Sequence, residues 1–474
     1  MKPRVWASRA RAVELVTGDG RRPMRPATGG WFEADADLRP GTDYRFAVDG
    51  GSPLPDPRSR WQAAGVDGPS RVDDPGAFAW TDAGWRGLEP ADLVIYELHI
   101  GTFTSAGTFA GAIERLDHVV ELGATAVEVM PVAEFPGDRG WGYDGVDLFA
   151  PHHAYGGPDG FRRFVDACHR RGLAVILDVV YNHLGPAGNN LAAFGPYFTD
   201  RYETPWGEAV NLDGEGSDEV RRFFIDNAHM WFADYHVDGL RLDAVHAMFD
   251  ASPCHFLAEL SGAVGALSAQ LGRRLLLTAE HEGADERIVL PRDAGGYGFD
   301  AVWFDDFHHA LHVAFTGERT GYYAGFEGLT DLPRIFERAE RVGPARLVAC
   351  VQNHDQVGNR ACGERLSQLT SLPVATLAAS MLFASPFVPL LFQGEEWGAT
   401  TPFRYFTDHR DPALARAVTE GRPREFAAFG WKPDEVPDPQ DPATFSRSVL
   451  DWDELDRPAH RAMLERYRRL IAGR

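Results

Sequence analysis

The sequence has few cysteines and no long apolar segment. Only four of its 474 residues are cysteine, and their positions lack the spacing of a metal site. Cys168 and Cys350 lie in apolar patterns, so we expect buried free thiols. Residues 1–8 lack the apolar core of a signal peptide, and no apolar run approaches the roughly 18 residues of a membrane span. We therefore expect a cytoplasmic protein without a membrane partner.

Positive charge is also scarce. Lys and Arg number 47 against 69 Asp and Glu, which gives a net charge of -22. Nucleic acids and anionic membranes are bound by clustered Lys and Arg, so neither kind of partner is expected. A neutral ligand such as a sugar is compatible with this charge, although the charge does not imply one.

A Gly-rich dinucleotide-binding motif is missing after the first strand-like run. From about Asp92 onward, apolar runs alternate with helical periods, which is typical of βα units around a parallel sheet. The eight candidate strands are residues 93–98, 126–130, 173–179, 239–243, 275–280, 301–304, 347–351 and 388–392. This order predicts a (β/α)8 barrel, also called a TIM barrel. A doubly wound open sheet is the alternative, which the missing motif disfavours.

Residues 1–88 differ from the rest of the chain. They contain short alternating stretches, such as residues 44–48, and turn signals at residues 49–51 and 53–57. We expect a small all-β module at residues 1–88 and a catalytic barrel at residues 89–474. The basic amphipathic stretch at residues 461–474 is expected to be the closing helix, so no C-terminal domain is expected after it.

Acidic residues follow several of the predicted strands. Asp243, Glu280 and Asp355 come at or just after the fourth, fifth and seventh strands, where a barrel places its active site. Cleaving a glycosidic bond needs one carboxylic acid to protonate the leaving oxygen and one carboxylate to attack or to activate water. A further anion stabilises the positive transition state. Arg241 points to the same face of its strand as Asp243 and could keep that carboxylate ionised.

Each of these residues also has a purely structural interpretation. A lone Asp at a strand end is more often a helix cap or an ion-pair partner, and Asp178 could simply orient Arg241. His183 and His354, taken singly, are more often satisfied loop or core histidines. Tyr143 could pack in the core or stack on a sugar ring. The joint pattern on four strands favours a functional site.

Five segments resemble the conserved regions of the α-amylase family, glycoside hydrolase family 13, in order and spacing. They are residues 130–135, 178–183, 239–246, the strand ending at Glu280, and residues 353–355. Further segments resemble the maltooligosyltrehalose trehalohydrolases of that family. They are residues 135–146, 305–309, 316–323, 352–360, 363–365, 392–398 and 401–403. In that family the N-terminal module is an immunoglobulin-like β-sandwich, which agrees with the pattern of residues 1–88.

The resemblance implies a reaction and a set of roles. These enzymes hydrolyse the α-1,4 bond next to the terminal trehalose of a maltooligosyl trehalose, with retention of configuration, and release trehalose. By motif, Asp243 is the nucleophile, Glu280 the general acid/base and Asp355 the stabiliser of the transition state. The remaining residues expected to contact the substrate from these regions are Arg241, His183, His354, Tyr143, Asp178 and His246. The resemblance also implies pairing with a maltooligosyl trehalose synthase.

The loops after the sixth and eighth strands carry family-specific residues, so we expect them to recognise the trehalose unit. Asp306, His308 and Glu396 are the candidates, and their structural alternative is pairing with barrel arginines. Asn182 matches a calcium-binding position of many α-amylases, but trehalohydrolases generally do not depend on that ion, so no cofactor or required metal is expected.

Relative to the family, we expect the usual C-terminal β domain to be absent, and the segment at residues 326–344 is short. The competing hypotheses are a glycogen-branching or debranching enzyme of the same family and a non-catalytic glucan-binding protein. The segments at residues 305–309 and 392–397 argue against the first, and three retained carboxylates argue against the second.

Overall fold

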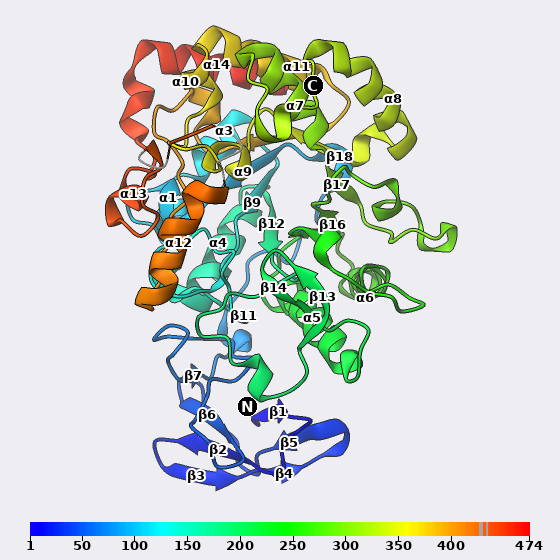
Figure 1. Cartoon of the computed structure of the whole chain (residues 1–474), viewed down its shortest axis with the longest axis vertical. Helices are drawn as coiled ribbons and strands as arrows, with labels where there is room; N and C mark the ends of the chain where they lie inside the picture. Colours follow the sequence, from blue (N-terminus) through cyan, green and yellow to red (C-terminus); the bar gives the residue numbers. More distant parts are fainter. Residues whose placement is uncertain (426–429, 433–434) are drawn as a thin grey trace.

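The centre of the molecule is a closed barrel of eight parallel strands, which confirms the predicted architecture (Figure 1). The computed structural model describes residues 1–425, 430–432 and 435–474. Around the barrel the strands follow in the order β12, β15, β16, β17, β18, β19, β8 and β9. In chain order they are β8 Ile95–Leu98, β9 Ala126–Val129, β12 Ala174–Val179, β15 Gly239–Leu242, β16 Leu276–Ala279, β17 Ala301–Trp303, β18 Leu347–Cys350 and β19 Val388–Phe392.

The barrel strands are apolar because both of their faces are covered. Every residue of β12 is buried, with Ile176 opposite Gly239 of β15 in the parallel register. One end of the barrel interior is filled by apolar side chains, among them Ile95, Ile176 and Leu390. At the carboxyl ends of the strands the inward-facing residues become charged, so the polar site lies above an apolar floor.

Helices surround the barrel, and α5 shows why. It carries Val220, Phe223 and Trp231, all fully or almost fully buried, along the face that packs inward. The helices are α1 Ile100–Phe103, α2 Phe109–Ile113, α3 Leu116–Leu122, α4 Gly157–His169, α5 Ser217–Asp234, α6 Phe256–Leu271, α7 Asp305–Thr316, α8 Leu332–Val342, α9 His354–Gly358, α10 Leu366–Leu369, α11 Leu372–Ala384, α12 Pro412–Glu425, α13 Pro442–Ser446 and α14 Pro458–Ala472.

The N-terminal residues form two small antiparallel sheets, seen in blue at the lower end of Figure 1. One contains β1 Arg4–Trp6, β5 Trp31–Glu33 and β4 Arg25–Pro26; the other contains β3 Gly20–Pro23, β2 Val13–Thr17, β6 Asp43–Val48 and β7 Ser70–Arg71. The segment after β6 docks onto barrel helices through charge: Arg58 lies 2.8 Å from Asp226 of α5, and Asp73 pairs with the buried Arg162 of α4. The two sheets confirm the prediction that the N-terminal region is built from β-strands.

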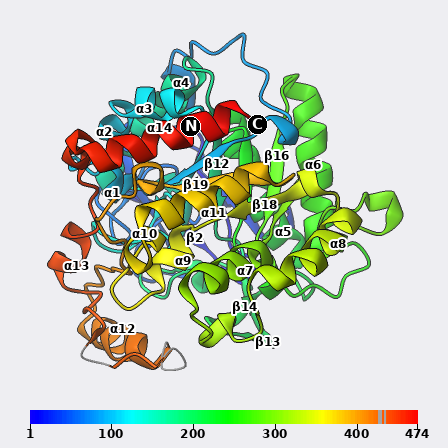
Figure 2. The same ribbon diagram turned by 90° about the horizontal axis from the view of Figure 1, so that it is seen from above.

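Two hairpins extend from the barrel. β10 Ala133–Glu134 pairs with β11 Asp147–Pro151 after strand β9, and β13 Phe198–Thr204 pairs with β14 Gly207–Val210 after strand β12. Loops that follow barrel strands lie at the carboxyl end, where they can shape the site. Seen from above, α12 stands at the rim of the molecule (Figure 2).

The cysteines behave as expected, since all four are free thiols and Cys168 and Cys350 are buried. Among the described residues, no helix combines the length and the apolar character that crossing a bilayer requires.

Candidate active site

The three predicted catalytic carboxylates meet at one cavity. Asp243 directly follows β15, Glu280 directly follows β16, and Asp355 lies in the first turn of α9 after β18. All three line a cavity of about 690 Å³ at the carboxyl end of the barrel. The structure therefore brings together, from three separate strands, the residues that the sequence predicted to act together.

Arg241 organises this group from below. Its guanidinium is fully buried and lies 2.9 Å from Asp178, 3.0 Å from Asp243 and 3.0 Å from Glu280. It also stacks on Trp303, 4.2 Å from the ring centre. Burial opposes its charge, but the surrounding carboxylates raise the pKa of Arg241 well above its ordinary value. One fixed cation thus holds both Asp243 and Glu280 in place.

Asp178 lies beneath the cavity rather than on it. Its carboxylate is 3% exposed and accepts hydrogen bonds from Arg241 at 2.9 Å and from the Tyr143 hydroxyl at 2.6 Å. Burial raises the pKa of Asp178 to about 7, against the opposing effect of Arg241. Asp178 is therefore placed to position Arg241 and Tyr143, which matches the structural alternative considered for it.

His354 and a residue that the sequence did not single out form a buried pair. Glu97 of β8 is 1% exposed, and it accepts hydrogen bonds from the backbone NH and the Nδ1 of His354. The Nε2 of His354 lies 2.7 Å from the Tyr143 hydroxyl. Burial would lower the pKa of His354, but Glu97 and Asp355 raise it to about 10. His354 is therefore a cation at pH 7, held under Tyr143 by Glu97.

The wall of the cavity carries aromatic and imidazole groups. His183 stacks on Trp206, with the ring centres 4.5 Å apart, and Trp206 remains 48% exposed at the tip of the β13–β14 hairpin. Burial lowers the pKa of His183 to about 4, so this ring is neutral at pH 7. His246 is exposed on the rim. Trp206 was not predicted, although a tryptophan within a Pro-Trp-Gly turn is the signal that could have drawn attention to it.

Comparison with known proteins identifies the family. The model for the alpha amylase catalytic domain matches residues 75–194. A malto-oligosyltrehalose trehalohydrolase of Arthrobacter ramosus is 50% identical, in an alignment that covers 99% of this chain and 86% of the relative. The chain belongs to the malto-oligosyltrehalose trehalohydrolase family.

Two further proteins are similar to this chain at lower sequence identity. A crystal structure of a Salmonella typhimurium protein assigned to the alpha amylases superposes with a TM-score of 0.91 at 40% identity, covering 99% of this chain and 83% of the other. A 1,4-alpha-glucan branching enzyme of Xanthomonas campestris is 33% identical, covering 83% of this chain and 59% of the relative. This branching enzyme is thus less similar to the chain than the trehalohydrolase of Arthrobacter ramosus is.

Two residues expected to contact trehalose do not reach the cavity in this trehalohydrolase-family chain. His308 is 2% exposed, and its Nδ1 lies 2.6 Å from the carbonyl oxygen of Val351. Glu396 is fully buried, 3.0 Å from the Tyr96 hydroxyl and 2.7 Å from His118 of α3. Both side chains are buried and bonded to other parts of the chain, which favours a structural role for them over the predicted contact with sugar.

Asp306 lies instead on a second cavity. This cavity, of about 390 Å³, is lined by Glu282, Phe304, Asp305, Asp306, His309 and Tyr322, among others. Asp306 also lies 2.9 Å from Arg338 of α8, the arginine pairing considered as its alternative. Burial raises the pKa of the neighbouring Asp305 to about 7, and Glu280 and Asp355 add to this effect. Asp305 is therefore close enough to the catalytic carboxylates to sense their charge.

The family-specific segment after α7 contains a charged cluster whose contribution to the stability of the fold should depend on pH. Glu318 lies 2.8 Å from His312 and 2.7 Å from Arg360. Its hydrogen bond with His312, aided by Arg360, lowers the pKa of Glu318 to about 2. A carboxyl whose pKa is lower in the folded chain stabilises it above its ordinary pKa and loses that contribution as the pH falls toward 2.

We therefore expect Glu318→Gln to lower the free energy of unfolding at pH 7 by about 2–3 kcal/mol. At pH 3 less than half of this difference should remain. Urea unfolding at both pH values measures it, with Glu340→Gln at an exposed position of α8 as the control. An equal loss at pH 7 and pH 3 would contradict the ionic origin of the effect.

Proposed function

We propose that this chain is a retaining glycosidase that hydrolyses the α-1,4 bond next to the terminal trehalose of a maltooligosyl trehalose. The products are trehalose and a shortened maltooligosaccharide. The observation that carries the proposal is the meeting of Asp243, Glu280 and Asp355 at one cavity in a chain that is 50% identical to a named trehalohydrolase. The substrate class is inferred from the relative, and the type of reaction is inferred from the three carboxyl groups that share the cavity.

The proposed reaction uses all three carboxyl groups. Asp243 attacks the anomeric carbon while Glu280 donates its proton to the oxygen of the leaving trehalose, which gives a glycosyl-enzyme ester. The Glu280 carboxylate then takes a proton from water, and the resulting attack on the ester restores Asp243. Asp355 lines the same cavity, where its negative charge would stabilise the oxocarbenium-like transition states.

The surrounding groups would bind the sugar rings. Tyr143 and Trp206 line the cavity, and aromatic rings of this kind can stack on the apolar side of a glucose ring. His183, neutral at pH 7, and the exposed His246 offer hydrogen-bonding groups for hydroxyls. Asp178 and His354 contact the Tyr143 hydroxyl from below, and Arg241 holds Asp178.

We propose that the second cavity receives the trehalose unit. It begins two residues after Glu280, at Glu282, and so lies on a side of the acid/base that a leaving group can occupy. Trehalose joins its glucoses through both anomeric carbons, so it bends differently from maltose and needs a pocket of its own. Buried hydrogen bonds can discriminate strongly, because a wrong ligand leaves polar groups unpaired.

Removing polar groups from this cavity should therefore change specificity. We expect Asp306→Ala and His309→Ala to lower kcat/KM for maltooligosyl trehalose about 10- to 100-fold and that for plain maltooligosaccharides much less, the scale set by losing one or two hydrogen bonds. Glu396→Gln is the control, since its buried position predicts an effect on stability and not on discrimination. Equal losses on both substrates, measured by steady-state kinetics, would assign the trehalose unit to another part of the cleft.

Product analysis tests the proposed reaction as a whole. Purified protein acting on maltopentaosyl trehalose should release trehalose, detected by chromatography, and proton NMR should show the α anomer of the new reducing end first. A branching or debranching enzyme would instead act on amylose or pullulan, and a glucan-binding protein would bind without turnover. Absence of trehalose would overturn the proposal.

The substrate implies a supplier. Maltooligosyl trehalose has to be made from a maltooligosaccharide by rearranging its reducing end, so we propose that this chain works with a maltooligosyl trehalose synthase. The cytoplasmic location stays a prediction, and the four free thiols agree with a reducing compartment.

A further inference from the structure

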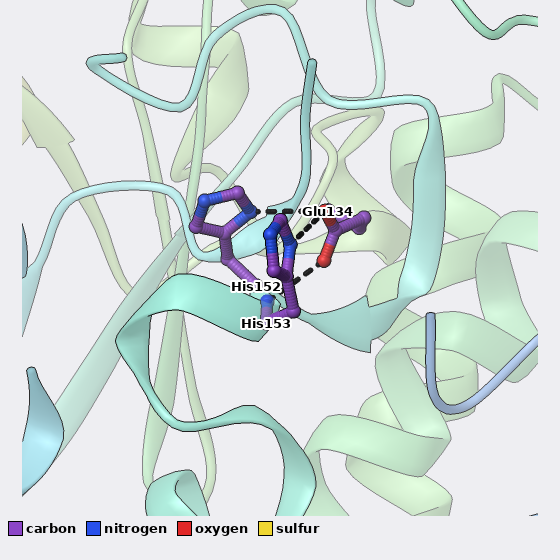
Figure 3. A group of neighbouring side chains, drawn as sticks. All are labelled: Glu134, His152 and His153. Atoms are coloured by element: carbon purple, nitrogen blue, oxygen red, sulfur yellow. Dashed lines mark hydrogen bonds and ion pairs between the residues drawn. The ribbon is translucent and has the colours of Figure 1, made fainter. Parts of the chain in front are cut away.

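A second group of ionisable side chains lies outside the catalytic cavity. Glu134 of β10 and the adjacent His152 and His153 place one carboxylate and two imidazoles side by side (Figure 3). Their nearest donor atoms all lie within 4.8 Å of one another. The hairpin of β10 and β11 brings them together, because Ala133 pairs with Pro151 just before the two histidines.

His152 is the most unusual member of the group. Its ring is fully buried, yet among the described residues neither of its nitrogens has a hydrogen-bond partner. Nδ1 lies 3.2 Å from Oε1 of Glu134, but without the geometry of a hydrogen bond. Phe135 stacks on the ring, 3.7 Å between centres, and fixes its orientation. A buried imidazole whose nitrogens make no well-formed hydrogen bond is costly, and a ligand bound at Nδ1 would offset part of that cost.

His153 faces the same oxygen of Glu134 with one ring nitrogen, and its other ring nitrogen lies near the carboxylate of Asp138. Its Nδ1 lies 2.6 Å from Oε1 of Glu134, and its Nε2 lies 3.2 Å from Oδ1 of Asp138. Metal-bound histidines typically donate their second ring NH to a carboxylate, which fixes the tautomer and the orientation of the ring. Asp138 is placed to do this for a metal bound at Nδ1.

We propose that Glu134, His152 and His153 form a binding site for a divalent zinc ion, with Asp138 as the positioning residue for His153. Two imidazoles and one carboxylate are a donor set that zinc accepts. Donors bound to one tetrahedral zinc at about 2.0–2.1 Å lie about 3.3 Å apart. The 3.2 Å between Glu134 and His152 already fits, and the 2.6 Å to His153 needs a small outward shift.

The ion can reach the site from solvent. The His153 side chain is 21% exposed and that of Asp138 is 61% exposed, whereas His152 and Glu134 close the inner side. A water molecule would complete the fourth position on the outer side. Bound there, zinc would link Glu134 at the end of β10 to the two histidines just after β11. The loop between these two strands carries Tyr143 into the active site. The site is distinct from the catalytic carboxylates and supplies no step of the reaction.

Calorimetric titration tests the proposal. Full-length protein, treated with EDTA and dialysed into metal-free buffer at pH 7, should bind one zinc ion per chain when titrated with ZnCl₂. Glu134→Gln and His153→Gln should lower the affinity at least tenfold. His229→Gln, a half-buried histidine of α5 outside both sites, is the matched control and should bind as the parent does.

Thermal unfolding supplies a second readout. Excess zinc should raise the Tm of the parent, because a ligand that binds only the folded chain stabilises it, and should leave the Tm of Glu134→Gln unchanged. If His153→Gln does not fold, Asp138→Asn replaces it and should weaken binding about tenfold. Absence of stoichiometric binding, or equal binding by parent and variants, would overturn the zinc site.

Discussion

Asp243→Asn is expected to lower kcat/KM for maltooligosyl trehalose by about 10⁴-fold or more, the order of loss when a covalent nucleophile is removed. The amide is nearly the same size as the carboxylate, so the contact with Arg241 at 3.0 Å can persist. What disappears is the negatively charged oxygen that attacks the anomeric carbon. The loss should therefore appear in kcat, with KM changed little.

The control for this variant is Glu280→Gln, which removes the proton donor but leaves the nucleophile. It should slow cleavage of a natural substrate by about 10²–10⁴-fold, and much less with a substrate whose leaving group needs no proton, such as an activated aryl glucoside. Asp243→Asn should stay inactive on both substrates. If Asp243→Asn retained more than a tenth of the parent rate, another residue would be the nucleophile.

The barrel could be predicted because its strands are buried on both faces. Such strands appear in the sequence as short continuous apolar runs, and β19 has the predicted bounds. Asp243 and Glu280 were predicted as the last residues of their strands, and the structure ends both strands one residue earlier. The chain leaves the sheet where the two carboxylates reach the cavity, so polar residues at the ends of apolar runs predicted which side chains come together there.

Residues that depend on packing between distant elements could not be predicted in this way. Glu396 follows a barrel strand as Asp243 does, but its turn is covered by α14, where Tyr467 contacts the adjacent Glu395 at 3.2 Å. No local pattern shows that a helix about 70 residues later covers this turn. Glu97 was missed for a similar reason, because a carboxylate inside an apolar strand gives no sign that it faces His354, which follows a strand two places away around the barrel.

Arg241→Leu is expected to remove activity and to lower the free energy of unfolding by about 3–5 kcal/mol. The leucine fills part of the space but leaves Asp178, Asp243 and Glu280 around a site that has lost its cation. Asp178, 3% exposed, has little access to water, so its desolvation is no longer offset. Urea unfolding at pH 7 measures the stability term, and kcat/KM measures the catalytic one.

Two further variants separate the charge from the shape of Arg241. Arg241→Lys keeps the charge but offers one point of contact in place of a planar fork, so stability should fall less than in Arg241→Leu while activity stays low. In an Asp178→Asn background the stability cost of Arg241→Leu should shrink by at least 1 kcal/mol, because one of the carboxylates no longer needs the cation. Strict additivity of the two substitutions would mean that Arg241 stabilises the barrel through its stacking on Trp303 rather than through Asp178. The catalytic loss would then reflect only the positioning of Asp243 and Glu280.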